Sequence, residues 1–184
     1  PAVAAHRYLV FLAVALHQFP EEARRIAAGD ERLLRSLVLE VRRLAPFFPL
    51  VLARTGRATE VAGVLVPGGA RVLLDLYATN RHPAAWPEPD LLDPERFLER
   101  QPGAYDYVPQ GGGDPATGHR CAGEQATLAL LEETARLLTR EVVYDVPQQD
   151  LRVDLSRVPT LPASGLVVQN VRAVSPATAQ PARR

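Results

Sequence analysis

Prolines gather in one long segment, and their positions restrict the fold of this chain more than any other feature. Five of them lie within residues 82–107: Pro83, Pro87, Pro89, Pro94 and Pro102. Proline lacks a backbone N–H and fixes φ, so a segment with this spacing belongs neither to a helix interior nor to a central strand. The same segment carries four aromatic residues with apolar surface to bury, Trp86, Phe97, Tyr105 and Tyr107. A flexible linker lacks such residues, and the sequence therefore predicts an ordered meander over residues 82–107.

Patterns typical of helices and strands flank the meander. Periodicity and terminal signals predict four helices, over residues 2–18, 20–29, 31–45 and 123–140, with Asp30 as the cap of the third. Short extended runs predict strands that together resemble a small antiparallel sheet, at 50–54, 59–62, 64–66 and 71–75, and two more at 142–146 and 165–171. The expected fold class is mainly α with small antiparallel β-sheets, an α+β fold. Residues 1–184 contain no repeat and no obvious boundary, so we expect a single domain.

Charge and composition exclude several classes of partner. The chain has 184 residues, in which 21 Lys and Arg residues balance 21 Asp and Glu residues. Without an excess of positive charge, binding to nucleic acid or to an anionic lipid surface is not expected. The single cysteine cannot form an internal disulfide, which favours a cytoplasmic protein. The chain contains no methionine, even at position 1, so we expect it to be a piece of a longer product.

The apolar run over residues 8–16 follows Arg7 and imitates a secretory signal. Its apolar residues recur at helical spacing, however, and no small-residue cleavage pattern follows it. The run is also far shorter than the roughly 20 residues that a membrane span needs. We therefore expect a buried helix here and no membrane span.

Cys121 stands out chemically, because it follows the glycine-rich loop Gly111–Asp114 and precedes the predicted helix at 123–140. The unsatisfied N–H groups and the dipole of a helix N-terminus favour a thiolate, and His119 and Arg120 add positive charge. Two interpretations are open at this point: a thiolate that acts as nucleophile or metal ligand, and a buried structural cysteine. Zinc is disfavoured, because the four histidines are not at ligand spacing: His6, His17, His82 and His119. The glycines match neither a P-loop nor a dinucleotide-binding fingerprint.

Several short motifs follow one another in a distinctive order. Glu40 and Arg43 lie three residues apart, on one face of the predicted helix at 31–45. Downstream come Trp86-Pro87-Glu88-Pro89, Asp93-Pro94-Glu95-Arg96-Phe97, Tyr107-Val108-Pro109-Gln110-Gly111 and Gly118-His119-Arg120-Cys121-Ala122-Gly123. This order and spacing resemble the C-terminal half of a cytochrome P450, over nearly the whole chain.

The resemblance implies the C-terminal portion of the cytochrome P450 fold, with five regions in set places. They are a remnant of the distal helix (1–18), the Glu-x-x-Arg helix (31–45), the meander (82–107), the haem-thiolate loop (107–123) and a proximal-side helix (123–140). By this resemblance Glu40, Arg43 and Arg96 would form a buried structural triad. Cys121 would be a catalytic residue and the metal ligand, as the thiolate on the iron of haem b.

The segment before Cys121 departs from the usual cytochrome P450 signature, and these departures indicate one branch of the family. Thr117 and His119 stand where the family usually has Gly and Arg, and the loop Gly111–Asp114 makes this region longer than usual. This variant resembles the bacterial fatty-acid peroxygenase branch of the family. Three further segments are similar to that branch, at 42–49, 74–77 and 144–147. The branch implies hydrogen peroxide as oxidant, a long-chain fatty acid as substrate, hydroxylation at the alpha or beta carbon, decarboxylation to an alkene as a side path, and no obligatory reductase.

The branch also implies roles for individual residues. Pro1 would belong to an Arg-Pro pair on the distal helix, a catalytic and substrate-binding position whose arginine would precede this chain. The pocket for the acyl chain would further include Ala2, Phe48, Leu50, Val51, Ser164, Gly165 and Leu166. Besides Cys121, the cofactor-binding residues would be His119 and Arg54, toward haem propionates, with Gly113 and Gly123. Two alternatives stay open: a monooxygenase that depends on a reductase and oxygen, and a non-catalytic haem-binding fragment.

Overall fold

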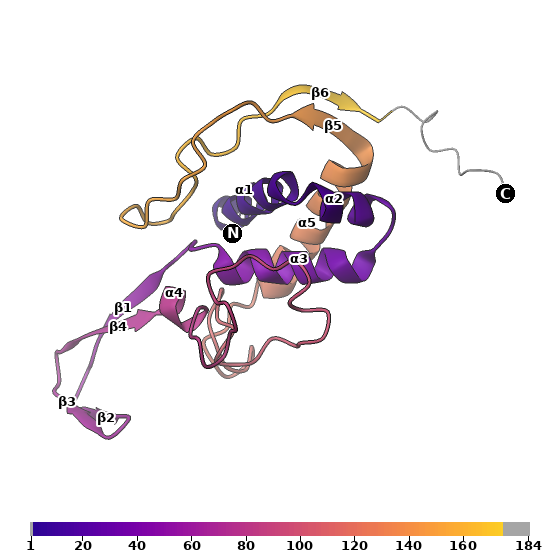
Figure 1. Cartoon of the computed structure of the whole chain (residues 1–184). Coiled ribbons are helices and arrows are strands. Elements are labelled where there is room, and N and C mark those ends of the chain that lie inside the picture. The colour runs from indigo at the N-terminus through magenta and orange to yellow at the C-terminus, as the bar shows by residue number, and fades with distance from the viewer. Residues whose placement is uncertain (1, 175–184) are drawn as a thin grey trace.

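Within the described part of the chain, three helices form the centre of the fold (Figure 1). They are α1 (Ala2–Gln18), α3 (Glu31–Leu44) and α5 (Glu124–Arg136), each in contact with the other two, and α2 (Pro20–Ala27) joins α1 to α3. Their apolar stripes meet in a core with fully buried leucines at its centre, among them Leu12, Leu33, Leu37 and Leu131. The computed structural model describes residues 2–174. Pro1, a predicted site residue, lies outside them, and Ala2 is placed only as the first residue of α1.

Local signals set the bounds of the helices, as the sequence predicts. Asp30 accepts a hydrogen bond from the Leu33 N–H at 3.0 Å and so caps α3. Pro20 occupies the first turn of α2, where a helix has no use for the missing N–H. The last predicted helix is divided, because α5 gives way to a π-helical turn, η1 (Leu137–Glu141). None of the helices within residues 2–174 has both the length and the apolar character to cross a membrane.

Within the same residues, the strands form three two-stranded antiparallel sheets. β1 (Leu50–Arg54) pairs with β4 (Arg71–Asp75), and β2 (Thr59–Val61) pairs with β3 (Val64–Val66). The single sheet expected over residues 50–75 is therefore two, and the second lies beyond the end of the first at the lower left of Figure 1. The regular register of the first ladder ends at Arg54. Beyond it, the Thr55 N–H still donates to Ala70 O at 3.0 Å, the Thr55 hydroxyl donates to Pro67 O at 2.6 Å, and Gly69 takes a φ of +78°.

The third sheet pairs β5 (Val142–Asp145) with β6 (Gln169–Ala173), which starts later than the strand expected at 165–171. Gly165 takes a φ of +66° in a turn and donates its N–H to Pro162 O at 2.8 Å. The Val167 N–H donates to Gln149 Oε1 at 2.8 Å. The N–H groups of Gly165 and Val167 are therefore hydrogen-bonded within a turn and to a side chain, before β6 begins.

Residues 82–107 form the predicted meander, a run of turns that contains neither helix nor strand. It follows the short helix α4 (Leu76–Thr79) and lies beside α3 (Figure 1). Three of its aromatic residues are buried with ring centroids 5.4–6.3 Å apart: Trp86, Phe97 and Tyr107. Tyr105 does not join them, since it is 77% exposed. The meander is thus anchored by three aromatic side chains rather than four.

β1 and β4 form an apolar hairpin with much of its surface open. Four of its aliphatic side chains are 48–66% exposed: Val51, Leu52, Leu73 and Leu74. Val51 pairs with Leu74 and Leu52 pairs with Leu73, so the two pairs lie on opposite faces of the hairpin. Exposed apolar surface of this kind marks a place where a ligand or another part of a protein binds. One side of the hairpin borders the loop before α5 and helps to form the site described next.

Candidate functional site

Cys121 lies at the end of the loop that leads into α5. Its backbone N–H donates to Gln110 O at 2.8 Å, and its carbonyl accepts the Glu124 N–H at 3.1 Å. The cysteine is exposed, so the interpretation as a buried structural cysteine is wrong. Gly123 is the N-cap of α5, and the thiol therefore sits just before a helix start, where partial positive charge gathers.

Two glycines let the loop close around the thiol. Gly111 takes a φ of +95°, and a Cβ at this position would lie 2.0 Å from His119 O, so a side chain would displace the backbone. A Cβ on Gly123 would lie 3.7 Å from Cys121 Sγ, in contact with the sulfur. Glycine at these two positions therefore keeps the loop tight and one side of the sulfur open.

Asp114 organises the turn in the middle of the loop. Its Oδ1 accepts the N–H groups of Ala116 at 2.8 Å and Thr117 at 3.1 Å. These backbone hydrogen bonds, with help from the Thr117 hydroxyl, hold the pKa of Asp114 below its usual value. Gly113 next to it donates its N–H to Ala104 O at 2.8 Å. The long glycine-rich loop is thus held by its own hydrogen bonds and by the meander.

An apolar cleft of about 620 Å³ opens beside Cys121. One wall comes from β1, β4 and their neighbours: Phe47, Phe48, Val51, Ala53, Val72, Leu74 and Leu76. The other comes from the loop: Pro109, Gln110, Gly111, Gly112, His119 and Cys121. Phe47 and Phe48 pack edge to face with ring centroids 4.6 Å apart. The cleft therefore combines a broad apolar surface with one thiol and one imidazole, which suits a large apolar ligand that the sulfur can bond to.

Some of the predicted site residues meet at this cleft. Phe48, Val51 and His119 line it together with Cys121. Leu50 begins β1 beside it but is not part of its lining. The structure therefore brings together a thiol, an imidazole and apolar side chains that lie up to 73 positions apart, from Phe48 to Cys121.

Other predicted site residues lie elsewhere. Arg54 is at the far end of β1 and donates to Gly69 O at 3.0 Å, away from the cleft lining. Ser164 and Gly165 line a separate hollow near the end of the chain. Leu166 belongs to the lining of neither. These four residues therefore do not share a site with Cys121 in this structure.

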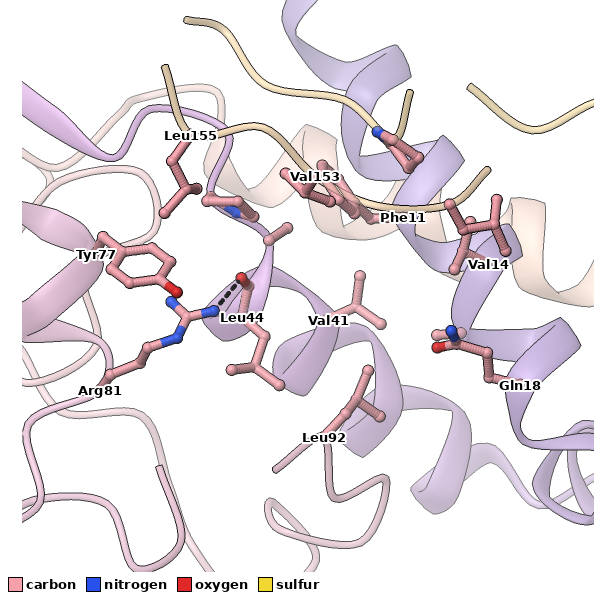
Figure 2. A pocket seen from close by; sticks show the side chains of 15 residues that line it. Phe11, Val14, Gln18, Val41, Leu44, Tyr77, Arg81, Leu92, Val153 and Leu155 are labelled. Carbon is pink, nitrogen blue, oxygen red and sulfur yellow. Dashed lines mark hydrogen bonds between the residues drawn. The ribbon is translucent and has the colours of Figure 1, made fainter. Parts of the chain in front are cut away.

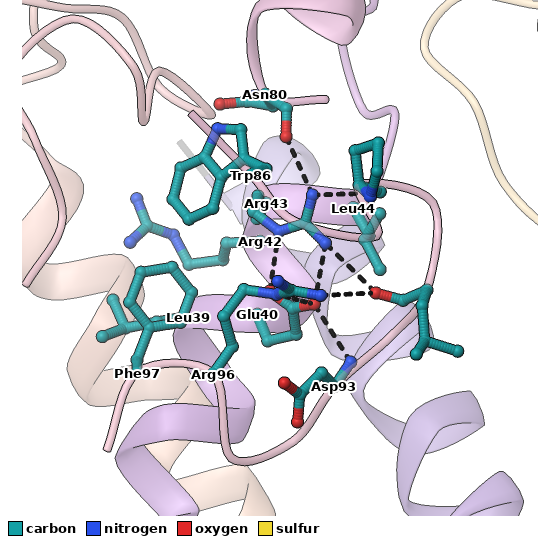
Figure 3. Close-up of polar contacts among 12 residues, drawn as sticks. Leu39, Glu40, Arg42, Arg43, Leu44, Asn80, Trp86, Asp93, Arg96 and Phe97 are labelled. Carbon is teal, nitrogen blue, oxygen red and sulfur yellow. Dashed lines mark hydrogen bonds and ion pairs between the residues drawn. The ribbon is translucent and has the colours of Figure 1, made fainter. Parts of the chain in front are cut away.

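Glu40, Arg43 and Arg96 form one buried network (Figure 3). Glu40 is 0% exposed and accepts from Arg43 Nε at 2.7 Å, from Arg43 Nη2 at 2.8 Å and from Arg96 Nε at 3.0 Å. Its Oε1 also accepts the Asp93 N–H at 3.1 Å. A buried carboxylate needs such partners, because an unpaired charge in the core is costly.

The same two guanidiniums collect carbonyls from the meander. Arg43 donates to Pro89 O at 2.7 Å and to Leu91 O at 3.2 Å. Arg96 donates to Pro87 O at 2.8 Å and also reaches Leu91 O, at 3.2 Å. In a β-strand these carbonyls would accept backbone hydrogen bonds from a neighbouring strand, whereas here they accept them from arginine side chains. The bonds from Arg43 attach the irregular meander to α3.

A second buried network, which none of the sequence motifs predicts, lies on another side of α3. Arg42 is 0% exposed and donates from Nη2 to Glu124 Oε1 at 2.5 Å and to Gln110 Oε1 at 2.8 Å. Its Nη1 donates to the Tyr107 hydroxyl at 3.3 Å. Burial by itself lowers the pKa of Arg42, but Tyr107 and Glu124 outweigh it and keep the pKa above its ordinary value. The adjacent pair Arg42-Arg43 is the sequence feature that could have predicted this second network. Neighbouring residues on a helix point about 100° apart, so two adjacent arginines reach different partners.

A further hollow of about 310 Å³ lies between α1, the end of α3 and residues 151–162 (Figure 2). Its lining is mainly apolar, and Arg81 is the charged member. The Arg81 guanidinium lies 3.7 Å from the centre of the Tyr77 ring and donates to Leu44 O at 2.7 Å, and burial lowers its pKa. Arg81 is therefore already occupied by contacts within the protein. The Cys121 cleft, which has a thiol and an imidazole in its lining, is the better candidate for the functional site.

The chain matches known proteins in sequence. The family model described as cytochrome P450 matches residues 30–139. Cytochrome P450 84A4 of Arabidopsis thaliana is 32% identical over 119 residues, which make up 62% of this chain and 22% of that protein. Putative cytochrome P450 137 of Mycobacterium tuberculosis is 30% identical over 148 residues, or 76% of this chain and 30% of that protein.

Solved structures are similar as well. Cytochrome P450EX alpha with myristic acid has 41% identity and a TM-score of 0.84, over 95% of this chain and 42% of that one. Cytochrome P450SP alpha in complex with (R)-ibuprophen has 42% identity and a TM-score of 0.84, over 94% and 42%. A variant of cytochrome P450 OleT in complex with arachidonic acid has 36% identity and a TM-score of 0.85, over 95% and 41%.

The chain thus spans between 21% and 42% of the lengths of the relatives named for comparison. Its part of the fold includes a buried Glu40–Arg43–Arg96 network and an exposed Cys121 beside an apolar cleft. Because the family model also covers more than half of its residues, the chain belongs to the cytochrome P450 family.

Proposed function

We propose that the chain is part of a haem-thiolate fatty-acid peroxygenase. The enzyme would use hydrogen peroxide to hydroxylate a long-chain fatty acid at the alpha or beta carbon, with decarboxylation to an alkene as a side path and no obligatory reductase. The observation that carries this proposal is the similarity, over 95% of the chain, to cytochromes P450 solved with myristic acid and with arachidonic acid. A cytoplasmic location belongs to the same proposal and rests on the single cysteine.

The residues at the cleft fit haem b, the cofactor that the family implies. A porphyrin is large, flat and mostly apolar, and the cleft offers about 620 Å³ between an apolar wall and the loop. The thiol of Cys121 is exposed at this cleft, and Gly123 leaves one side of the sulfur open. Cys121 would therefore hold the iron, and the backbone at Gly123 would allow the macrocycle to approach.

Cys121 contributes the negative charge in this arrangement. As the thiolate ligand, Cys121 would donate electron density to the haem iron, and haem held in this way would supply the chemistry for O–O cleavage. Two backbone hydrogen bonds hold the Cys121 backbone at the edge of the cleft, which the cysteine lines. Phe48 and Val51 would contact apolar parts of the cofactor or the acyl chain and exclude water from them.

The remaining predicted residues have unequal support. His119 lines the cleft, where an N–H of its imidazole would donate to a haem propionate. The same role for Arg54 would require its bond to Gly69 O to open. The roles of Pro1, Ala2 and Leu50, of Gly113 and of residues 164–166 rest on the resemblance alone.

The test is product analysis with the haem-loaded full-length protein, myristic acid and hydrogen peroxide, without a reductase. We expect a hydroxylated fatty acid, and we expect Cys121→Ala to abolish it. Glu60→Gln, on the exposed hairpin strand β2, is the matched control and should keep the activity.

The alternative is a monooxygenase that needs a reductase and oxygen. Tabersonine 6,7-epoxidase isoform 1 of Catharanthus roseus, 34% identical over 107 residues, favours it among the sequence relatives. Product that forms only with reductase and oxygen would contradict the peroxygenase proposal. Haem uptake without turnover under either condition would support a non-catalytic haem-binding protein.

A further inference from the structure

The backbone of Cys121 is held on both sides by residues outside the reactive position. Its N–H donates to Gln110 O at 2.8 Å, and its carbonyl accepts the Glu124 N–H at 3.1 Å. Gln110 precedes it by 11 positions in the loop, whereas Glu124 is the first residue of α5. The direction of the sulfur therefore depends on where the loop and the helix start are held relative to each other.

One guanidinium holds both of these partners. Arg42 Nη2 donates to the Gln110 side chain at 2.8 Å and to the Glu124 carboxylate at 2.5 Å. Its Nη1 donates to the Tyr107 hydroxyl at 3.3 Å, and that hydroxyl donates back to Leu39 O on the same helix at 2.9 Å. Arg42 is fully buried in the last turn of α3, and its contacts therefore join this helix to the start of the loop and to the first residue of α5.

We propose that Arg42 is the positioning residue for Cys121. It fixes the Gln110 and Glu124 side chains, and through their backbones it sets the orientation of the sulfur toward the cleft. The consequence for chemistry rests on the proposed role of Cys121 as the iron ligand, whereas the positioning itself is a property of the polypeptide.

The task of Arg42 differs from that of Arg43, its neighbour in the sequence. Figure 3 shows the two side chains leaving α3 in different directions, and the Arg42 guanidinium points away from Glu40. Arg43 donates to Glu40 and to meander carbonyls, while Arg42 donates to the loop and to α5. Arg42 therefore holds the segments around the Cys121 thiol, and Arg43 holds the meander.

The geometry also argues for arginine in particular. Three acceptors, on Tyr107, Gln110 and Glu124, are reached from two nitrogens of one rigid plane. A lysine has a single ammonium on a shorter stem, so it keeps the charge without holding the three acceptors together. Arg120 donates to the second oxygen of Glu124 at 3.3 Å, which leaves that carboxylate with a cationic partner when Arg42 is changed. Arg42→Lys is therefore a variant that removes the positioning and keeps the charge balance.

Amide hydrogen exchange of the full-length protein without haem tests the positioning directly. In Arg42→Lys we expect the N–H groups of Cys121 and Glu124 to exchange about tenfold faster, because their acceptors and neighbours are no longer held. The N–H groups of Leu33 and Phe97, which are hydrogen-bonded at the other end and on another face of α3, should keep their rates. Equal acceleration at all four sites would mean a general loss of stability and would overturn the proposal, as would unchanged rates at Cys121.

Two further variants make the test sharper. Arg35→Lys changes an exposed arginine of the same helix that pairs with Glu132, and it should leave the Cys121 rate unchanged. Gln110→Ala removes the side chain that Arg42 holds and keeps the carbonyl that accepts the Cys121 N–H. Gln110→Ala should increase the exchange rate of the Cys121 N–H more than that of the Glu124 N–H. If Arg42→Lys does not fold, this variant tests the positioning role in its place. Equal effects on both amides in Gln110→Ala would contradict the proposed route.

The spectrum of the reduced, carbon-monoxide-bound haem protein supplies a second readout. We expect the wild type to show the thiolate-ligated form and Arg42→Lys to show a smaller fraction of it, with Arg35→Lys as the control. A wild type without the thiolate-ligated form would refute the proposed role of Cys121 and leave the exchange result standing. A full thiolate signal in Arg42→Lys, together with slow Cys121 exchange, would refute the positioning role and leave the proposed function standing.

Discussion

Replacement of Glu40 by alanine is expected to destabilise the protein strongly and to weaken the attachment of the meander to α3. The carboxylate is fully buried and accepts four hydrogen bonds, from Arg43 Nε and Nη2, from Arg96 Nε and from the Asp93 N–H. Removal of one partner of a buried ion pair costs about 3–5 kcal/mol, because the other charge stays buried without compensation.

The structure favours the lower end of that range. After the change, Arg43 keeps acceptors at Asn80 O, Pro89 O and Leu91 O. Arg96 keeps three carbonyl acceptors of the meander as well. The guanidiniums lose their counter-charge but not all of their hydrogen bonds, and we therefore expect a loss of about 3 kcal/mol in the free energy of unfolding.

Urea unfolding of the full-length protein, followed by far-UV circular dichroism, measures this loss. Glu21→Ala is a matched control, since Glu21 and Arg24 have the same three-residue spacing on α2 but are 71% and 69% exposed. An exposed pair of this kind contributes less than about 1 kcal/mol. If Glu40→Ala were no more destabilising than Glu21→Ala, and the protein kept its haem, the buried network would not hold the meander and our reasoning would be wrong.

Three further predictions concern the loop before α5. Gly111→Ala should prevent haem uptake, measured by titration of the haem-free protein, because the added Cβ would lie 2.0 Å from His119 O; normal affinity would contradict the tight-loop geometry. Cys121→Ser should shift the carbon-monoxide spectrum away from the thiolate form while far-UV circular dichroism stays unchanged, and an unaltered spectrum would exclude Cys121 as the ligand. The lowered pKa of Asp114 means that its contribution to stability is present above its ordinary value of 3.8 and is lost as the pH falls through the lowered pKa. Amide exchange in this turn, corrected for the intrinsic effect of pH, should therefore increase below about pH 4, and Asp114→Asn should remove that dependence.

The last turn of α3 links the two parts of the site. Arg42 contacts the cysteine loop and α5, and Arg43 contacts the meander. Both are fully buried, so the helix brings two charges into the core and each finds a carboxylate there, Glu124 for the first and Glu40 for the second. Helix α3 thus sets the distance between the meander and the loop that carries Cys121.

Local signals in the sequence are enough to predict most of the helices and the types of residue at the site. The bounds of α1, α2 and α3 follow from local signals, such as Asp30 as a cap and Pro20 in a first turn. Proline spacing predicts the meander, because each proline restricts its own backbone whatever surrounds it. The order of Glu40, Arg43, Arg96 and Cys121 predicts the family, since a motif is a pattern along the chain.

Tertiary structure decided what depends on distances across the fold. Arg42 and Glu124 are 82 positions apart, and no local spacing sets the 2.5 Å contact between them. The same holds for the division of the first sheet, for the exposure of Tyr105 and for the placement of Ser164 away from Cys121. Periodicity reports which face of an element is apolar, but the partner of a buried charge is chosen by which segments pack together, because burial makes an unpaired charge costly and only packing decides which opposite charge is within reach.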